Sequence, residues 1–166
     1  MRALAGVLLV CLALGGSASL HAQDTAPKIG DLAPPVTVND LDGKPVNLGG
    51  FLGQRPVFLE FWATWCEVCE ALLPKVKSAM DRYGEKVEFI GINVTVNQKR
   101  GDVRDYLKQH QLRFRSLYDD EGASIRAYQV PATSYIVIAD RAGKIIYTGM
   151  GSTQNFDRAL QQASRP

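Results

Sequence analysis

Apolar residues along the chain fall into short runs that alternate with stretches of helical spacing. Runs rich in β-branched and aromatic residues predict strands at 57–61, 87–94, 113–120, 133–139 and 144–149. Apolar residues three or four apart predict helices at 69–84, 102–111, 122–128 and 155–164. Valines that alternate with polar residues around Asp42-Gly43 predict an N-terminal β hairpin. This order predicts an α/β fold, with a mixed central sheet flanked by helices on both sides.

The first 22 residues differ from the rest of the chain. Arg2 precedes an uncharged apolar run at 3–14, and small residues lead to a possible cleavage point after Ala22. This pattern predicts a secretory signal peptide at 1–22, a flexible linker at 23–29 and one domain at 30–166. The alternative is a membrane anchor, although a spanning helix needs roughly 20 apolar residues. We therefore expect a periplasmic protein, membrane-anchored if the leader is not cleaved.

The balance of charged residues limits the classes of partner that the protein is expected to bind. The chain has 19 basic and 17 acidic residues, a formal net charge of +2, and no Lys/Arg run. This balance argues against nucleic acid as a partner. We expect a monomer without a bound cofactor.

Removal of the leader removes Cys11, so only Cys66 and Cys69 remain. The pair could belong to a zinc site, form a structural disulfide, or act as a redox couple. Zinc needs about four ligands, and beyond the pair the exported chain offers one histidine, His110, and no cysteine. A structural disulfide would close a very short loop, where the entropic gain is smallest. The pattern therefore favours a redox-active disulfide and no metal.

The position of the pair between a strand and a helix suggests separate roles. Cys66 would lie at the helix N-terminus, where backbone N–H groups and the helix dipole stabilise a thiolate. Cys69 lies one turn further and can resolve a mixed disulfide formed at Cys66. Trp62 is expected in the core, and Trp65 at an exposed substrate-docking surface.

Glu67 stands between the cysteines and is also expected at the docking surface. Its negative charge disfavours a thiolate and opposes the helix dipole. We therefore expect a reduction potential closer to that of thioredoxin, about −270 mV, than to that of DsbA, about −120 mV. The alternative is a solvated glutamate with little effect.

The segment FWATWCEVCEALLP, residues 61–74, resembles the active site of the TlpA/ResA-like thiol–disulfide oxidoreductase family, which has the thioredoxin fold. The segment GDLAPPVTVNDLDGKPVNL resembles the N-terminal hairpin of that family, which peroxiredoxins share. The resemblance implies that Cys66 is the nucleophile, that Cys69 resolves, and that Pro74 kinks the active-site helix. It covers nearly all of the exported chain.

The resemblance also implies roles for three residues outside the cysteine motif. Pro131 matches a cis-proline that faces the disulfide, and Val130 before it would offer its backbone to the substrate chain. Extra residues between Pro131 and Gly143 depart from the family pattern and predict a longer or bulged strand. Glu60 matches a buried acid below the disulfide and could relay protons to and from Cys69. The alternative is that strand alternation turns Glu60 toward solvent or a structural partner.

The resemblance implies an exported enzyme that reduces disulfides in other exported proteins and receives electrons from a membrane thiol donor. In this family the substrates include cysteines of apocytochrome c and of metal sites in oxidase assembly. A thiol peroxidase is an alternative, but Ala63 stands where peroxiredoxins usually carry a threonine. A copper chaperone like the Sco proteins is another, but those proteins separate their cysteines by three residues. Direction of electron flow is not fixed by the motif.

Overall fold

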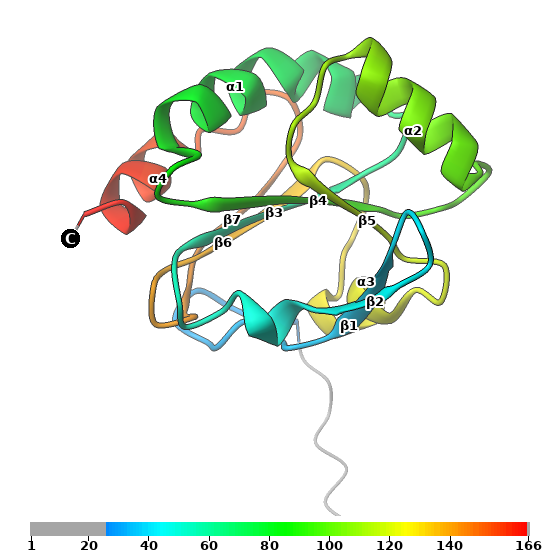
Figure 1. Ribbon diagram of the computed structural model, residues 1–166. Helices are drawn as coiled ribbons and strands as arrows, with labels where there is room; N and C mark the ends of the chain where they lie inside the picture. The colour runs from blue at the N-terminus through cyan, green and yellow to red at the C-terminus, as the bar shows by residue number, and fades with distance from the viewer. Residues whose placement is uncertain (1–25, 166) are drawn as a thin grey trace, which may run out of the picture.

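The computed structural model describes residues 26–165, and Figure 1 shows its strands and helices. The strands are β1 (Thr37–Asp40), β2 (Pro45–Asn47), β3 (Val57–Trp62), β4 (Glu88–Asn93), β5 (Arg115–Tyr118), β6 (Tyr135–Ala139) and β7 (Ile145–Met150). The helices are α1 (Glu67–Tyr83), α2 (Arg100–Gln109), α3 (Ala123–Tyr128) and α4 (Asp157–Ala163), with a short 3-10 helix η1 (Leu48–Gly50). All the predicted elements form, with ends shifted by a few residues.

The strands form one mixed sheet in the order β2-β1-β5-β4-β3-β6-β7. The central strands β3, β4 and β5 run parallel, and the other neighbours pair antiparallel. Every residue of β3 and β4 is buried, as expected for central strands that are covered on both faces. The predicted fold class is confirmed. The N-terminal hairpin extends the same sheet by pairing β1 with β5.

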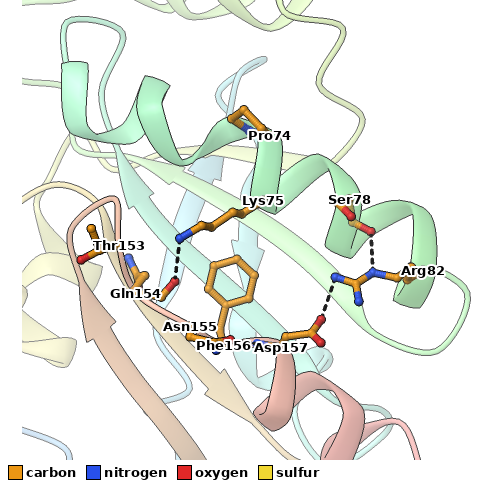
Figure 2. A pocket seen from close by; sticks show the side chains of 9 residues that line it. All are labelled: Pro74, Lys75, Ser78, Arg82, Thr153, Gln154, Asn155, Phe156 and Asp157. Atoms are coloured by element: carbon orange, nitrogen blue, oxygen red, sulfur yellow. Dashed lines mark hydrogen bonds and ion pairs between the residues drawn. The ribbon is translucent and has the colours of Figure 1, made fainter.

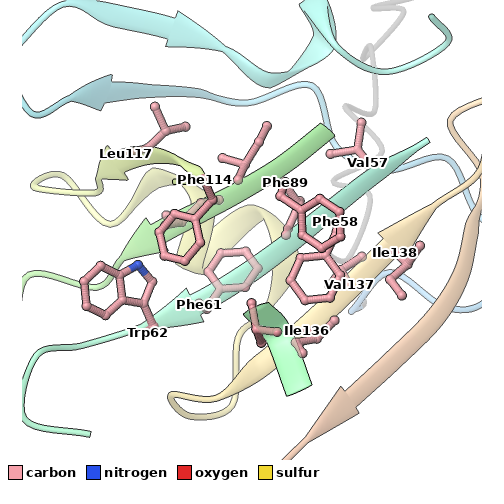
Figure 3. Close-up of a cluster of buried hydrophobic side chains, with 14 of the residues drawn as sticks. Val57, Phe58, Phe61, Trp62, Phe89, Phe114, Leu117, Ile136, Val137 and Ile138 are labelled. Carbon is pink, nitrogen blue, oxygen red and sulfur yellow. The ribbon is translucent and has the colours of Figure 1, made fainter. Parts of the chain in front are cut away.

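Helices cover both faces of the sheet. Figure 1 shows α1, α2 and α4 on one face and α3 on the other. Alternate side chains of β3 enter the two layers: the Trp62 ring lies 5.2 Å from that of Tyr106 in α2, and the Phe61 ring lies 5.5 Å from that of Tyr128 in α3. Figure 3 shows this buried cluster around β3 and its neighbours. The strand that leads to the cysteines is therefore held by core packing on both sides.

The turns of the β1–β2 and β6–β7 hairpins share one structure, an aspartate that caps the turn and a glycine with positive φ. The Asp40 carboxylate accepts hydrogen bonds from the backbone N–H groups two and four residues later, at 2.8 and 2.9 Å, and Gly43 has a φ of 82°. Asp140 and Gly143 repeat this arrangement between β6 and β7. A register shift between Ile138 and Ala139 confirms the predicted bulge in β6.

The first residues of the described chain pair with the β6–β7 hairpin. Leu32 lies opposite Lys144 in an isolated antiparallel bridge. The Gly30 N–H donates to the Ile145 carbonyl, and the Ile145 N–H donates to the Asp31 carbonyl, both at 2.8 Å. This pairing covers the first part of β7, which is an edge strand of the sheet.

Two predicted segments fall mainly outside the described residues. The signal peptide at 1–22 lies entirely outside them, and of the linker at 23–29 only the last four residues are described. Both therefore stay predictions. Among residues 26–165, no helix is long and apolar enough to cross a membrane.

Candidate active site

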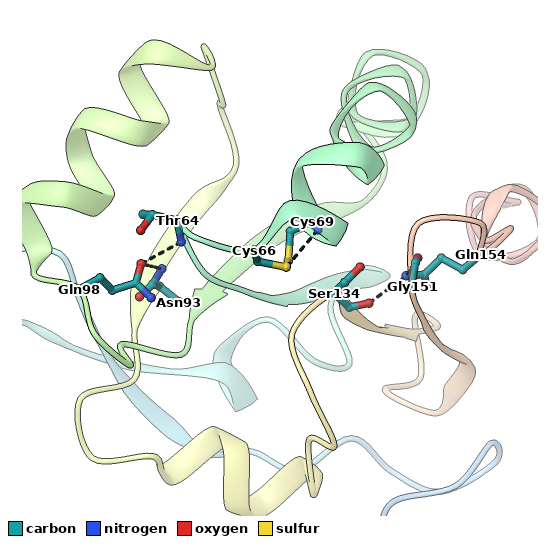
Figure 4. The surroundings of a disulfide bond; sticks show 8 residues. All are labelled: Thr64, Cys66, Cys69, Asn93, Gln98, Ser134, Gly151 and Gln154. Atoms are coloured by element: carbon teal, nitrogen blue, oxygen red, sulfur yellow. Dashed lines mark hydrogen bonds between the residues drawn. A yellow bond between two sulfur atoms is a disulfide. The ribbon is translucent and has the colours of Figure 1, made fainter.

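Cys66 and Cys69 form a disulfide at the start of α1, as predicted (Figure 4). Their Cα atoms are 5.2 Å apart. Cys66 is the N-cap residue of α1, and its Sγ accepts a hydrogen bond from the Cys69 N–H at 3.0 Å. A reduced Cys66 at this position would have a backbone donor and the positive end of the helix dipole beside its thiolate. Both cysteines are buried, with 5% of Cys66 and 2% of Cys69 exposed.

The surface near the disulfide exposes several apolar side chains. Trp65, Val68 and Val96 are 49%, 45% and 54% exposed. The Trp65 Nε1 donates a hydrogen bond to the Val96 carbonyl at 2.6 Å, which joins the cysteine loop to the loop after β4. Glu67 is exposed in the first turn of α1. The predicted exposure of Trp65 and burial of Trp62 are confirmed.

A buried amide that sequence reasoning missed fixes the cysteine loop from one side. The Gln98 Oε1 accepts hydrogen bonds from the Thr64 N–H at 2.9 Å and from the Asn93 Nδ2 at 3.0 Å. The Gln98 carbonyl accepts another from the Tyr118 hydroxyl at 2.8 Å. Gln98 thus ties the residue two before Cys66 to the ends of β4 and β5. No local pattern marks this glutamine, because its partner Thr64 lies 34 residues away.

Glu60 is buried in the middle of β3, with 2% of its surface exposed. The prediction of burial is confirmed, and the alternative of a solvent-facing glutamate is wrong. Its Oε1 atom has no hydrogen-bond partner. Burial raises the pKa of Glu60 from 4.5 to about 8, because the charged form would lose its hydration. A carboxyl of this kind holds a proton at neutral pH and can give it up to a nearby base.

Tyr106 connects this buried region to the surface. The centroid of its ring lies 5.2 Å from that of Trp62 and 4.1 Å from that of His110, on which it stacks. Burial raises the pKa of Tyr106 to about 12, and the negative charges of Glu70 and Glu60 add to the effect. Two acidic side chains therefore act on Tyr106, the buried Glu60 and the exposed Glu70.

The prediction of a cis bond at Pro131 is wrong, because none of the peptide bonds among the described residues is cis. Pro131 lies in an exposed stretch between α3 and β6, four residues before β6 begins. The residue that meets β3 is Ser134, whose N–H donates to the Phe61 carbonyl at 2.8 Å. A likeness to family members with a shorter connection placed the proline too close to the strand. Val130 is half-buried and lies two residues after α3, and its role in docking stays a prediction.

Ser134 lies in the surroundings of the disulfide, on the side opposite Gln98 (Figure 4). It is fully buried, and its hydroxyl has no hydrogen-bond partner. Its φ of 62° is left-handed, a conformation that costs a residue other than glycine about 1–2 kcal/mol. Such a backbone persists where neighbouring contacts hold it, which is common at functional sites.

A pocket of about 490 Å³ lies between α1 and the loop before α4 (Figure 2). No cysteine lines it. Its charged groups already have partners: the Lys75 Nζ donates to the Ser152 carbonyl at 3.1 Å, and Arg82 pairs with Asp157 at 2.7 Å. These two contacts attach α4 and the loop before it to α1. Within the described part of the chain, no group of three or more His, Cys, Asp or Glu side chains could hold a metal ion.

Comparisons with known proteins agree with this geometry. The family model described as Redoxin matches residues 28–162. The chain is 33% identical over 143 residues to the thiol-disulfide oxidoreductase ResA of Bacillus thuringiensis subsp. konkukian, covering 84% of this chain and 81% of that protein. It is 32% identical over 143 residues to the methylamine utilization protein MauD of Paracoccus versutus, covering 86% and 68%.

A solved structure gives the same assignment. A Chlorobium tepidum protein described as a thiol:disulfide interchange protein DsbE superposes with a TM-score of 0.70 at 27% identity, covering 83% of this chain and 96% of that one. The alignment with the family model includes the disulfide, the buried glutamate and the strand that follows Ser134. From these matches we conclude that the chain belongs to the Redoxin family, as a thiol–disulfide oxidoreductase of the ResA and DsbE type.

Proposed function

We propose that this protein is exported to the periplasm and reduces disulfides in other exported proteins. The observation that carries the proposal is the placement of a buried cysteine pair at a helix N-terminus, beside exposed apolar side chains. An apolar rim such as Trp65 and Val68 suits a polypeptide substrate better than a small polar oxidant. Similarity to proteins named ResA and DsbE supports thiol–disulfide exchange as the chemistry.

The exchange proceeds in two steps that conserve electrons. In the reduced protein the Cys66 thiolate attacks one sulfur of a substrate disulfide, forming a mixed disulfide and releasing the other substrate sulfur as a thiolate. Cys69 then loses its proton and attacks the Cys66 sulfur, which forms the Cys66–Cys69 disulfide and releases the second substrate thiolate. The substrate gains two electrons and two protons. A membrane thiol donor restores the reduced pair by the same chemistry in reverse.

Glu60 is suited to manage the proton of the second step. It is buried in the strand that leads to the cysteines, and its raised pKa lets it hold a proton near neutral pH. We propose that its ionised form, a minority at neutral pH, accepts the Cys69 proton when the thiolate is needed, as the family resemblance implies. A pKa of about 8 lies close to that of a free thiol, about 8.5, so the proton can pass in either direction. The two acids at the surface, Glu67 and Glu70, disfavour thiolate and therefore favour a reducing couple.

Redox equilibration against glutathione and dithiothreitol tests the direction of electron flow. A reductase should have a potential near that of thioredoxin, about −270 mV, and a value near that of DsbA, about −120 mV, would contradict the proposal. The Cys69→Ser variant should accumulate mixed disulfides with exported proteins, and Cys66→Ser serves as its matched control. Exported apocytochromes are the substrates to test first.

Export is tested separately, by fractionation of cells that express the full chain. N-terminal sequencing of the periplasmic form should begin at Gln23 if the leader is cleaved as proposed. Recovery of the whole chain in the cytoplasm would refute export. It would leave the exchange chemistry intact.

A further inference from the structure

Gln154 is a buried glutamine whose side chain reaches the segment beside the disulfide. It lies in the loop between β7 and α4 and is 8% exposed. Its Nε2 donates hydrogen bonds to the Ser134 carbonyl at 2.9 Å and to the Gly151 carbonyl at 2.8 Å. Its Oε1 accepts one from the Tyr147 hydroxyl at 3.2 Å. Both amide protons are therefore used, and each goes to a backbone carbonyl.

The same contacts fix Ser134 from two directions. Its N–H continues the pairing with β3 through Phe61, and its carbonyl also accepts from the Gly151 N–H at 3.3 Å. Gln154 adds the shorter of the two bonds to that carbonyl. Without these bonds the left-handed backbone of Ser134 would relax toward a more favourable region. The residues just before it, 131–133, would then lose their anchor.

The packing around Gln154 leaves the amide little freedom to move. A Cβ atom added to Gly149 would lie 2.8 Å from the Gln154 Oε1 and 2.3 Å from the Tyr147 hydroxyl. The Gln154 main chain is held as well, since its carbonyl accepts from the Lys75 Nζ of α1 at 3.5 Å. The amide is thus a rigid connection from α1 and β7 to the segment beside the disulfide.

We propose that Gln154 is a positioning residue for disulfide exchange, because its amide holds Ser134 and the adjoining segment 131–133 in the conformation that receives a substrate polypeptide. The inference rests on the proposed function, since it concerns polypeptide substrates. The Gln154 amide donates to backbone carbonyls and not to a sulfur atom. Its loss should therefore affect large disulfide substrates more than small ones.

Two variants separate positioning from general stability. Gln154→Met has similar length but cannot donate a hydrogen bond. Gln154→Glu cannot donate when ionised, but its protonated carboxyl offers one donor for the Ser134 carbonyl. Gln161→Glu, at an exposed position of α4, is the matched control for the added charge.

Each variant is assayed in reduced form with insulin as a protein disulfide and with 5,5′-dithiobis(2-nitrobenzoic acid) as a small one. Loss of a buried hydrogen bond predicts about a 10-fold slower reaction of Gln154→Met with insulin. The rate with the small disulfide should stay within about 2-fold of wild type, since its attack needs only Cys66. For Gln154→Glu, the insulin rate divided by that of wild type should rise as pH falls, because protonation restores a donor for the Ser134 carbonyl.

Equal slowing with both substrates, or no slowing with insulin, would overturn the role of Gln154. If Gln154→Met does not fold, Gln154→Glu alone provides the test. An insulin rate, relative to that of wild type, that does not change with pH would then also overturn the role of Gln154. An inactive wild-type chain would refute the proposed function and this inference together. An active wild type with unaffected Gln154 variants would refute the inference alone.

Discussion

Replacing Glu60 by glutamine tests whether the carboxyl inside the central strand is protonated at neutral pH. Glu60 is 2% exposed, and its Oε1 has no hydrogen-bond partner, so ionisation would place an uncompensated charge in the core. Glutamine has nearly the same shape and stays neutral at every pH. The variant therefore removes the titration and keeps most of the packing.

The magnitude follows from the two pKa values. Burial raises the pKa of Glu60 from 4.5 to about 8. Between these pH values the unfolded chain releases a proton that the folded protein keeps, so the free energy of unfolding falls as pH rises. Each pH unit changes it by about 1.4 kcal/mol. The interval of 3.5 pH units, 8 minus 4.5, therefore amounts to about 5 kcal/mol.

Urea unfolding of the oxidised proteins provides the assay, because the disulfide keeps the cysteines from titrating. The free energy of unfolding of Glu60→Gln minus that of wild type should grow by about 5 kcal/mol from a pH well below 4.5 to a pH well above 8. Subtraction cancels the other titrating groups, which both proteins share. A difference that changes by less than about 1 kcal/mol would refute the reasoning, since the carboxyl would then ionise without penalty.

Three further substitutions test the site and the sheet. Glu67→Gln removes a charge beside the thiolate, so the potential should rise by about 10 mV in glutathione equilibration; no rise would mean that solvent screens the charge. Trp65→Ala should slow insulin reduction several-fold and spare the small disulfide, whereas equal slowing would place Trp65 outside the docking surface. Gly91→Ala puts a Cβ 2.3 Å from the Phe114 ring and should lower unfolding free energy in urea by about 1–3 kcal/mol. Unchanged stability would show that Phe114 moves aside at little cost.

Local patterns predicted the elements because burial of a strand or a helix face leaves a periodic trace. The apolar run of β3 and the spacing of Leu72, Val76 and Met80 in α1 are examples. The cysteine pair was predictable for a similar reason, since its chemistry depends on residues within one turn of helix. Burial of Glu60 could be expected because a lone acid interrupts an apolar run.

The parts that escaped prediction depend on contacts between distant residues. Gln98 and Gln154 resemble the exposed glutamines elsewhere in the chain, and only their partners 34 and 20 residues away make them part of the site. The pairing of β1 with β5 is likewise set by tertiary packing. Pro131 was misplaced because the length of the connection before β6 decides which residue meets β3, and a single sequence does not show that register.

The bridge between Leu32 and Lys144 fixes where the start of the described chain lies relative to the disulfide. It lies beside the β6–β7 turn, next to the Ala139 end of β6, which pairs with Val57 at the start of β3. Cys66 follows the other end of β3, and six residues at about 3.3 Å each separate the two ends by about 20 Å. The chain around Lys28 is thus held at the end of the sheet opposite the disulfide. Any tether on that side would turn the reactive sulfur outward, toward partners that approach from solution.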